Sequence, residues 1–338
     1  MSIYVSIPCL NYDQELIKTI RCINDNSSGK NKITIGIAII GNEDFMSFIK
    51  EQLIKYKYTN VKLSFFKFEN NIGVGKGRHL AYSMYNNEDY LLQIDSHTFL
   101  LKNWDKKLIN IHRRAKIVTK NKLVVLSGLP PAYGYFNEQA EKSFWHHKQC
   151  KYPQYLNNDY LINSSNNKDF YKIKNKMYKE MIPKFIDNNF NKLRKESKTK
   201  KRLSNIYPLH KISAAFMFGA KNFAYNIGLE SNSIFWEEEI LQSINLINNG
   251  FSICFYNGKI PLCHYYSNEM KKDKFGIRSF ATDIIDEKEL YKKMAEKWSA
   301  FMNNKENQLK IKKYEKYADV DLNIGANNKN FIPKKFNK

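Results

Sequence analysis

The chain has 338 residues, of which 43% are hydrophobic and 14% are aromatic. This content is enough for a large core, so a chain that is disordered throughout is excluded. Lysine and arginine outnumber aspartate and glutamate by 55 to 33, and the formal net charge is +22. Such a charge favours polyanionic partners, although the abundance of lysine and asparagine also fits a purely compositional bias.

The five cysteines are odd in number and form no CxxC pair. Several of them sit in apolar, strand-like runs, which is typical of small core residues in a reducing compartment and not of a disulfide framework. No charged-then-apolar leader precedes Ile3, and no apolar run approaches the length that spans a bilayer. We therefore expect a soluble, cytoplasmic protein without a transmembrane segment.

Strands and helices alternate regularly over the first hundred residues. This rhythm predicts an α/β fold with a mostly parallel, mixed sheet flanked by helices, which is a nucleotide-binding architecture. The expected strands are Met1 to Cys9, Ile33 to Ile40, Val61 to Phe68 and Tyr90 to Ile94. The expected helices are 13–24, Glu43 to Tyr56 and Gly73 to Asn86.

The pattern is less regular in the second half of the chain. A basic, lysine- and asparagine-rich stretch over 136–207 reads as an insertion, either helical or a mobile flap. We expect residues 1–270 to form the main α/β domain and 271–338 to form a charged, partly helical extension with a poorly ordered end. The elements expected here are helices 103–119, Trp236 to Asn248 and Glu287 to Phe301, and strands 122–128, 212–219, Phe251 to Tyr256 and Ile260 to His264.

The segment from Tyr90 to His97 is the strongest candidate for a functional site. It is a buried strand that ends on Asp95 and His97, and residues two apart in extended backbone point to the same side. Ligands of open α/β sheets bind at the carboxyl ends of the strands. One carboxylate and one imidazole suit Mn²⁺, Mg²⁺ or Zn²⁺, and a diphosphate in the site favours the first two. The alternative is a polar strand end whose histidine only makes hydrogen bonds.

The segment from Asn71 to Arg78 is rich in glycine and opens a helix. It does not satisfy the phosphate-loop pattern, and a dinucleotide fingerprint would follow the first strand and not the third. Two interpretations stay open. The segment is either a helix N-terminus that favours anions, with Arg78 able to reach a diphosphate, or a tight turn followed by a surface arginine.

Two further features come late in the chain. Glu237, Glu238 and Glu239 open a helix, where acidic residues commonly complement the helix dipole, but one of them could orient an acceptor hydroxyl or remove its proton. His264 ends an apolar strand. It is either a hydrogen-bonded residue near the core or, if the sheet brings it beside Asp95 and His97, a third metal ligand.

These motifs in this order resemble GT-A glycosyltransferases, which use nucleotide-sugar donors. The resemblance spans about residues 3 to 266. The segment from Val5 to Asn11 is similar to their first strand, Asn71 to Arg78 to their NxGxxxAR element with glycine at the alanine position, and Asp95-Ser96-His97 to their DxD or DxH metal motif. Glu238-Glu239 and His264 match the family's acidic pair and distal metal-binding histidine.

Within that superfamily, the segment from Glu88 to Phe99, with Trp104-Asp105, is most similar to the cytosolic polypeptide α-N-acetylglucosaminyltransferases that modify hydroxyproline. The resemblance implies a UDP-sugar donor such as UDP-GlcNAc, a protein or glycan hydroxyl as acceptor, and retention of configuration. The sequence departs from the pattern of this group at Glu237 and Asn245, which leaves the identities of the acceptor and of the sugar open.

The resemblance also assigns roles to residues. Mn²⁺ or Mg²⁺ would be held by Asp95, His97 and His264, and Glu238 or Glu239 would position the acceptor, with Glu239 the better general base if the reaction inverts. Two other functions stay open: glycosyl transfer to nucleic acid, and a non-catalytic binding module on the same scaffold. The remaining donor-binding residues would be Pro8, Cys9, Asn11, Gly73, Arg78 and Ser96, together with Asp95.

Overall fold

The computed structural model describes residues 1–10, 13, 15–67, 74–128, 130, 206–209, 211–228, 233, 237–256, 260–264, 296–297 and 300–318. Most of the expected basic insertion, 136–207, lies outside the described residues, as does most of the expected helix from Glu287 to Phe301.

The described residues form one eight-stranded sheet in the order β3-β2-β1-β4-β8-β6-β9-β7. The pairs β1–β2, β2–β3, β1–β4 and β6–β9 are parallel, and the other three pairs are antiparallel. The expected mostly parallel mixed sheet is therefore confirmed. Its strands are β1 (Ser2–Leu10), β2 (Lys32–Gly41), β3 (Val61–Lys67), β4 (Tyr90–Ile94), β6 (Val124–Ser127), β7 (Ile206–Leu209), β8 (Phe216–Ala220) and β9 (Ser252–Tyr256).

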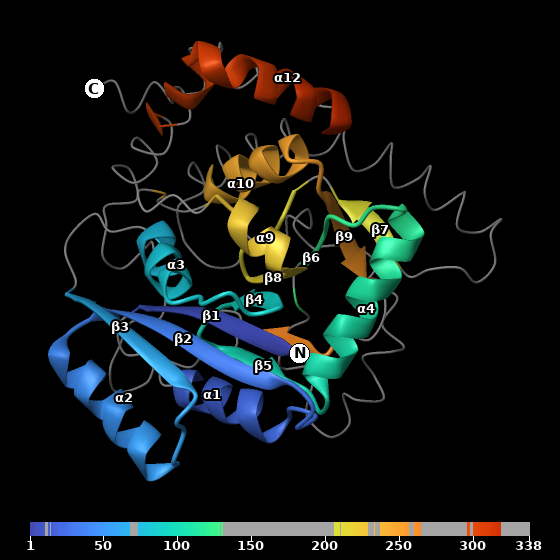
Figure 1. Ribbon diagram of the computed structural model, residues 1–338. Helices are drawn as coiled ribbons and strands as arrows, with labels where there is room; N and C mark the ends of the chain where they lie inside the picture. The colour runs from blue at the N-terminus through green and yellow to red at the C-terminus, as the bar shows by residue number, and fades with distance from the viewer. Residues whose placement is uncertain are drawn as a thin grey trace, which may run out of the picture.

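Helices cover both faces of this sheet. Figure 1 shows α1 and α2 on one side of strands β1 to β3, with α3 on the other side. Among the described helices, none combines the length and the apolar character that crossing a membrane requires. The helices are α1 (Glu15–Asp25), α2 (Glu43–Lys55), α3 (Val74–Ser83), α4 (Trp104–Thr119), α9 (Lys221–Asn226), α10 (Glu237–Asn248) and α12 (Lys305–Ala318).

Strand β1 shows how the sequence builds a core on each face of the sheet. Ile3, Val5 and Ile7 point into the core beneath α1, α2 and α4, whereas Tyr4 points into a second core beneath α9, α10 and α12. Successive side chains of a strand alternate between faces. A strand buried on both faces therefore reads as the continuous apolar run seen in the sequence.

Two regions differ from the expected elements. The strand expected over 212–219 begins at Phe216, because the residues before it form a turn closed by a hydrogen bond from the Phe216 N–H to the Ser213 carbonyl (3.2 Å). Ile206 and Tyr207, the last two residues of the expected insertion, instead open the edge strand β7, which pairs with β9.

A two-stranded antiparallel sheet lies beside the main sheet and was not expected as such. It pairs β5 (Thr98–Leu100) with β10 (Leu262–His264), and its register sets His264 opposite Thr98. This pairing ties the residues just after β4 to a segment more than 160 positions later in the chain.

The C-terminal helix α12 packs on α10, and Figure 1 shows the two helices side by side. Ile311 and Tyr314 of α12 are buried in the second core. The Asn248 side chain donates to the Lys310 carbonyl (2.9 Å), and the Lys313 ammonium donates to the Asn248 carbonyl (2.9 Å). The end of the described chain thus supports the helix that carries Glu238 and Glu239.

Candidate active site

The candidate site lies at the carboxyl ends of β1 and β4. These strands are parallel neighbours, so the residues that follow each of them emerge at the same edge of the sheet. Asp95 and His97 follow β4, and Asp13 follows β1. The β5–β10 pairing then brings His264 to the same place.

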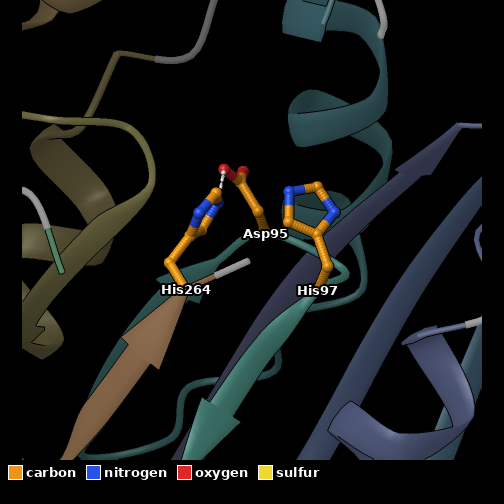
Figure 2. A group of neighbouring side chains, drawn as sticks. All are labelled: Asp95, His97 and His264. Atoms are coloured by element: carbon orange, nitrogen blue, oxygen red, sulfur yellow. Dashed lines mark hydrogen bonds and ion pairs between the residues drawn. The ribbon is translucent and has the colours of Figure 1, made fainter. Parts of the chain in front are cut away.

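Asp95, His97 and His264 form one cluster, shown in Figure 2. One possible ligand atom from each of them lies within 4.8 Å of the other two. The His264 Nε2 atom is 3.0 Å from the Asp95 Oδ2 atom, and the two imidazole rings meet edge to face with their centroids 4.6 Å apart. A carboxylate oxygen and two imidazole nitrogens at this spacing fit a divalent cation such as Mn²⁺. His264 therefore lies beside the pair Asp95 and His97, as the expectation of a third ligand required.

Asp13 is a member of this site that the sequence did not reveal as one. Its Oδ2 atom is 2.8 Å from the His97 Nδ1 atom and also accepts a hydrogen bond from the Ser96 hydroxyl. Its Oδ1 atom accepts from the Glu15 N–H (3.0 Å), as in a helix cap. The sequence predicts only this last interaction, because capping is local whereas the contact with His97 joins residues 84 positions apart.

Neighbouring charges shift the pKa values of all three residues of the cluster. Burial alone would raise the pKa of the Asp95 carboxyl, but the hydrogen bond from His264 and the charge of Arg78 outweigh burial and hold that pKa below its ordinary value. Burial lowers the pKa of His97, but the Asp13 carboxylate more than offsets this, so the pKa of His97 lies above its ordinary value. Burial and the nearby His97 together lower the pKa of His264.

Arg78 is buried beside the cluster instead of lying on the surface. Its guanidinium pairs with Glu238 of α10, and its Nη2 atom is 3.7 Å from the Asp95 Oδ1 atom. The preceding Gly77 lets α3 approach the sheet closely, since a Cβ atom there would lie 3.2 Å from the Pro8 Cβ atom and from the end of Ile40. Arg78, the next residue of α3, therefore lies at the edge of the sheet at which Asp95 lies.

The two acidic residues of α10 have different surroundings. Glu238 is 1% exposed, and its carboxylate pairs with Arg78 and accepts from the Gln242 amide (2.8 Å). Glu239 is partly exposed, pairs with Lys211 (2.7 Å) and accepts from the Ala214 N–H (2.9 Å). Of these two carboxylates, only that of Glu239 has appreciable access to an incoming molecule.

The remaining predicted donor-binding residues have these positions. Pro8 and Cys9 belong to β1, and the Cys9 side chain is buried. Ser96 is also buried; its hydroxyl donates to Asp13, and its carbonyl accepts from the Thr19 hydroxyl (2.8 Å). Asn11 and Gly73 lie outside the described residues.

An α/β sheet with a carboxylate–imidazole cluster at the strand ends is suited to binding a metal ion together with a phosphate-bearing ligand. A family model described as "Glycosyltransferase (GlcNAc)" matches residues 42–328, which is most of the chain. The chain therefore belongs to the Glycosyltransferase (GlcNAc) family, and it is a glycosyltransferase. This agrees with the sequence resemblance to GT-A glycosyltransferases, whereas membership of the hydroxyproline-modifying group is not shown.

Solved glycosyltransferase structures are similar to the chain at low sequence identity. GalNAc-T7, crystallised with UDP, GalNAc and Mn²⁺, is 13% identical with a TM-score of 0.49, and the match covers 95% of this chain and 55% of GalNAc-T7. Residues 1–349 of TarS from S. aureus, in complex with UDP-GlcNAc, are 12% identical with a TM-score of 0.48, over 99% of this chain and 83% of that one. The chain thus spans little more than half the length of GalNAc-T7. A comparison with curated protein sequences gave no significant match.

Proposed function

We propose that this glycosyltransferase is metal-dependent and moves GlcNAc from UDP-GlcNAc to a hydroxyl group of a protein or glycan, with retention of configuration. The sugar follows the description of the family and the sequence resemblance. The observation that carries the metal dependence is the convergence of Asp95, His97 and His264, whose ligand atoms lie within 4.8 Å of one another.

Asp95, His97 and His264 would hold the cation. When bound, Mn²⁺ supplies Lewis-acid stabilisation of the charge that develops on the departing diphosphate. The residues of the chain supply the rest of the site. Arg78 lies 3.7 Å from Asp95 and adds a positive charge beside the cluster. Backbone at the end of β1 and at the start of α3 would bind the uridine and ribose.

Glu239 is the better candidate of the two acids for positioning the acceptor hydroxyl. The Glu238 carboxylate is engaged by Arg78 and Gln242 and is almost fully buried. Glu239 is partly exposed, and Lys211 and the Ala214 N–H fix its orientation. In a retaining reaction the departing phosphate oxygen can accept the proton of the acceptor, so Glu239 orients the hydroxyl and need not act as the base.

The donor is tested by incubating the purified chain with a panel of nucleotide sugars and following release of the nucleoside diphosphate. We expect slow hydrolysis of UDP-GlcNAc that requires Mn²⁺ or Mg²⁺ and is abolished by chelation. Asp95→Ala and His97→Ala should remove this activity. His112→Gln is a matched control, because His112 is a buried histidine that packs against Tyr90, at the other end of β4.

The acceptor is tested with a hydroxyproline-containing peptide and its proline counterpart, and the mass of each is measured after incubation with the donor. Modification of the first peptide alone supports the acceptor class that the resemblance implies. Wild-type hydrolysis by both Asp95→Ala and His97→Ala would show that the proposed metal site is wrong.

A further inference from the structure

Asp13 belongs to neither the predicted ligand set nor the predicted donor-binding set, yet its carboxylate is bonded to the cluster. It lies after β1, and its Oδ2 atom is 2.8 Å from the His97 Nδ1 atom. The same oxygen accepts from the Ser96 hydroxyl, and Oδ1 accepts from the Glu15 N–H. Three partners thus hold this carboxylate in place.

The contact with Asp13 determines which nitrogen of His97 can bind a cation. An ionised carboxylate only accepts hydrogen bonds, so the proton between the two groups belongs to Nδ1 of His97. In the neutral imidazole the lone pair then lies on Nε2. Figure 2 shows one ring nitrogen of His97 directed towards Asp95 and the other directed away from it. Because Nδ1 is bonded to Asp13, the nitrogen directed towards Asp95 is Nε2.

We propose that Asp13 is a positioning residue that holds His97 in the Nδ1–H tautomer and aims its Nε2 atom at the cation. This inference rests on the proposed metal site and extends it by one residue. The physical basis is general: an imidazole ligand keeps its orientation and its tautomer when its second nitrogen donates to a carboxylate. Without Asp13, the Ser96 hydroxyl, 3.5 Å away, is the only described group that remains beside Nδ1, and a hydroxyl can donate as well as accept, so the His97 proton can move to the nitrogen that faces Asp95.

The test uses Asp13→Asn and Asp13→Ala in the full chain. Mn²⁺ alone is titrated up to millimolar concentration, and the free ion is counted by electron paramagnetic resonance. We expect the Kd for Mn²⁺ to rise about 10- to 100-fold in both variants. Asp13→Asn keeps the size of the side chain and an oxygen that can cap α1, so its melting temperature should stay close to that of the wild type.

Asn42→Ala is the control for the loss of a helix cap. Asn42 accepts from the Phe45 N–H (2.9 Å) at the start of α2. This variant should lose stability without any change in the Kd for Mn²⁺. A second readout needs no metal: at a pH high enough to leave the His97 imidazole neutral, the ring nitrogen shifts of ¹⁵N-labelled histidine should report the Nδ1–H tautomer for His97 in the wild type and a shift towards Nε2–H in Asp13→Ala.

The possible failures are distinguishable. If the wild type binds Mn²⁺ and both Asp13 variants bind it equally well, the role of Asp13 is wrong and the metal site stands. An unchanged tautomer of His97 in Asp13→Ala would also overturn the role of Asp13. If the wild type does not bind Mn²⁺, the proposed metal site and the role of Asp13 are both wrong.

Discussion

The guanidinium of Arg78 and the carboxylate of Glu238 form a buried ion pair that joins α3 to α10. Arg78 is 6% exposed and Glu238 is 1% exposed. The other terminal nitrogen of the guanidinium, Nη2, lies 3.7 Å from the Asp95 Oδ1 atom, so the Arg78 charge lies between two carboxylates. The pair therefore connects the proposed metal site to the helix that bears Glu239.

Breaking this pair should destabilise the protein strongly. Replacing Glu238 with Ala leaves the Arg78 charge buried, with no carboxylate of the described residues in direct contact and only those of Asp95 and Glu239 nearby. We expect the free energy of unfolding to fall by about 3–5 kcal/mol. Chemical denaturation of Glu238→Ala measures this. Lys18→Ala is the control, since the Lys18–Glu15 pair lies on the surface and should contribute no more than about 1 kcal/mol.

Replacing Gly36 or Gly77 with alanine should change the stability of the protein by different amounts. A Cβ atom on Gly36 would lie 1.6 Å from the hydroxyl oxygen of Tyr4, which is buried and donates to the Ala81 carbonyl. We expect Gly36→Ala to cost about 3 kcal/mol through overpacking. Gly77→Ala meets its neighbours at 3.2 Å, and the better helix propensity of alanine, about 1 kcal/mol, should offset most of the crowding. Thermal denaturation of both variants checks the contrast, and equal losses would contradict it.

His112 should make stability depend on pH. Burial lowers its pKa to about 4, although its Nε2 atom lies 3.0 Å from the Val124 carbonyl. The ordinary pKa of histidine is about 6.5, so between these values the unfolded chain binds a proton that the folded chain does not. Stability is therefore lost as the pH falls through this window, by about 1.4 kcal/mol per pH unit.

The measurement compares the free energy of unfolding of the wild type and His112→Gln at pH 7.5 and pH 5. Glutamine keeps an N–H donor and does not titrate. The wild type should lose about 2 kcal/mol more than the variant over this interval. Equal losses would mean that His112 does not contribute to the acid sensitivity of the fold.

The helix α12 should stabilise α10. Ile311 is 1% exposed in the second core, whereas Leu309 of the same helix is 78% exposed. We expect Ile311→Ala to lower the free energy of unfolding by about 2–5 kcal/mol, because it leaves a cavity against α10. Leu309→Ala should change it by less than about 0.5 kcal/mol. Urea denaturation of the two variants tests whether α12 belongs to the folded core.

Much of this architecture could be predicted from the sequence. The first four strands are β-branched or apolar runs separated by helices with periodic apolar residues, and such periodicity survives without any knowledge of tertiary contacts. The position of Asp95 and His97 after the fourth strand followed from the same pattern. Strands β5 and β10 have only three residues each, too few for a periodic signal, so the pairing that carries His264 to the cluster was not predicted.

The features that the sequence did not reveal depend on partners far along the chain. Asp13 satisfies the local pattern of a helix cap, which conceals its contact with His97. Glu238 looks like an ordinary acidic residue in the first turn of a helix, and only the approach of Arg78 from α3 makes it a buried ion-pair partner. Most positions of α12 are polar or charged, and of its described side chains only Ile311 and Tyr314 are buried. Two buried apolar residues are too few for the sequence to predict an amphipathic helix here.

The most direct test of the central claim is a crystal structure of the chain grown with Mn²⁺ and UDP, with anomalous diffraction recorded on both sides of the manganese absorption edge. We predict one strong anomalous peak that is coordinated by Asp95, His97 and His264 and by the diphosphate of UDP. A manganese peak bound to the diphosphate but away from His97 and His264 would contradict the account.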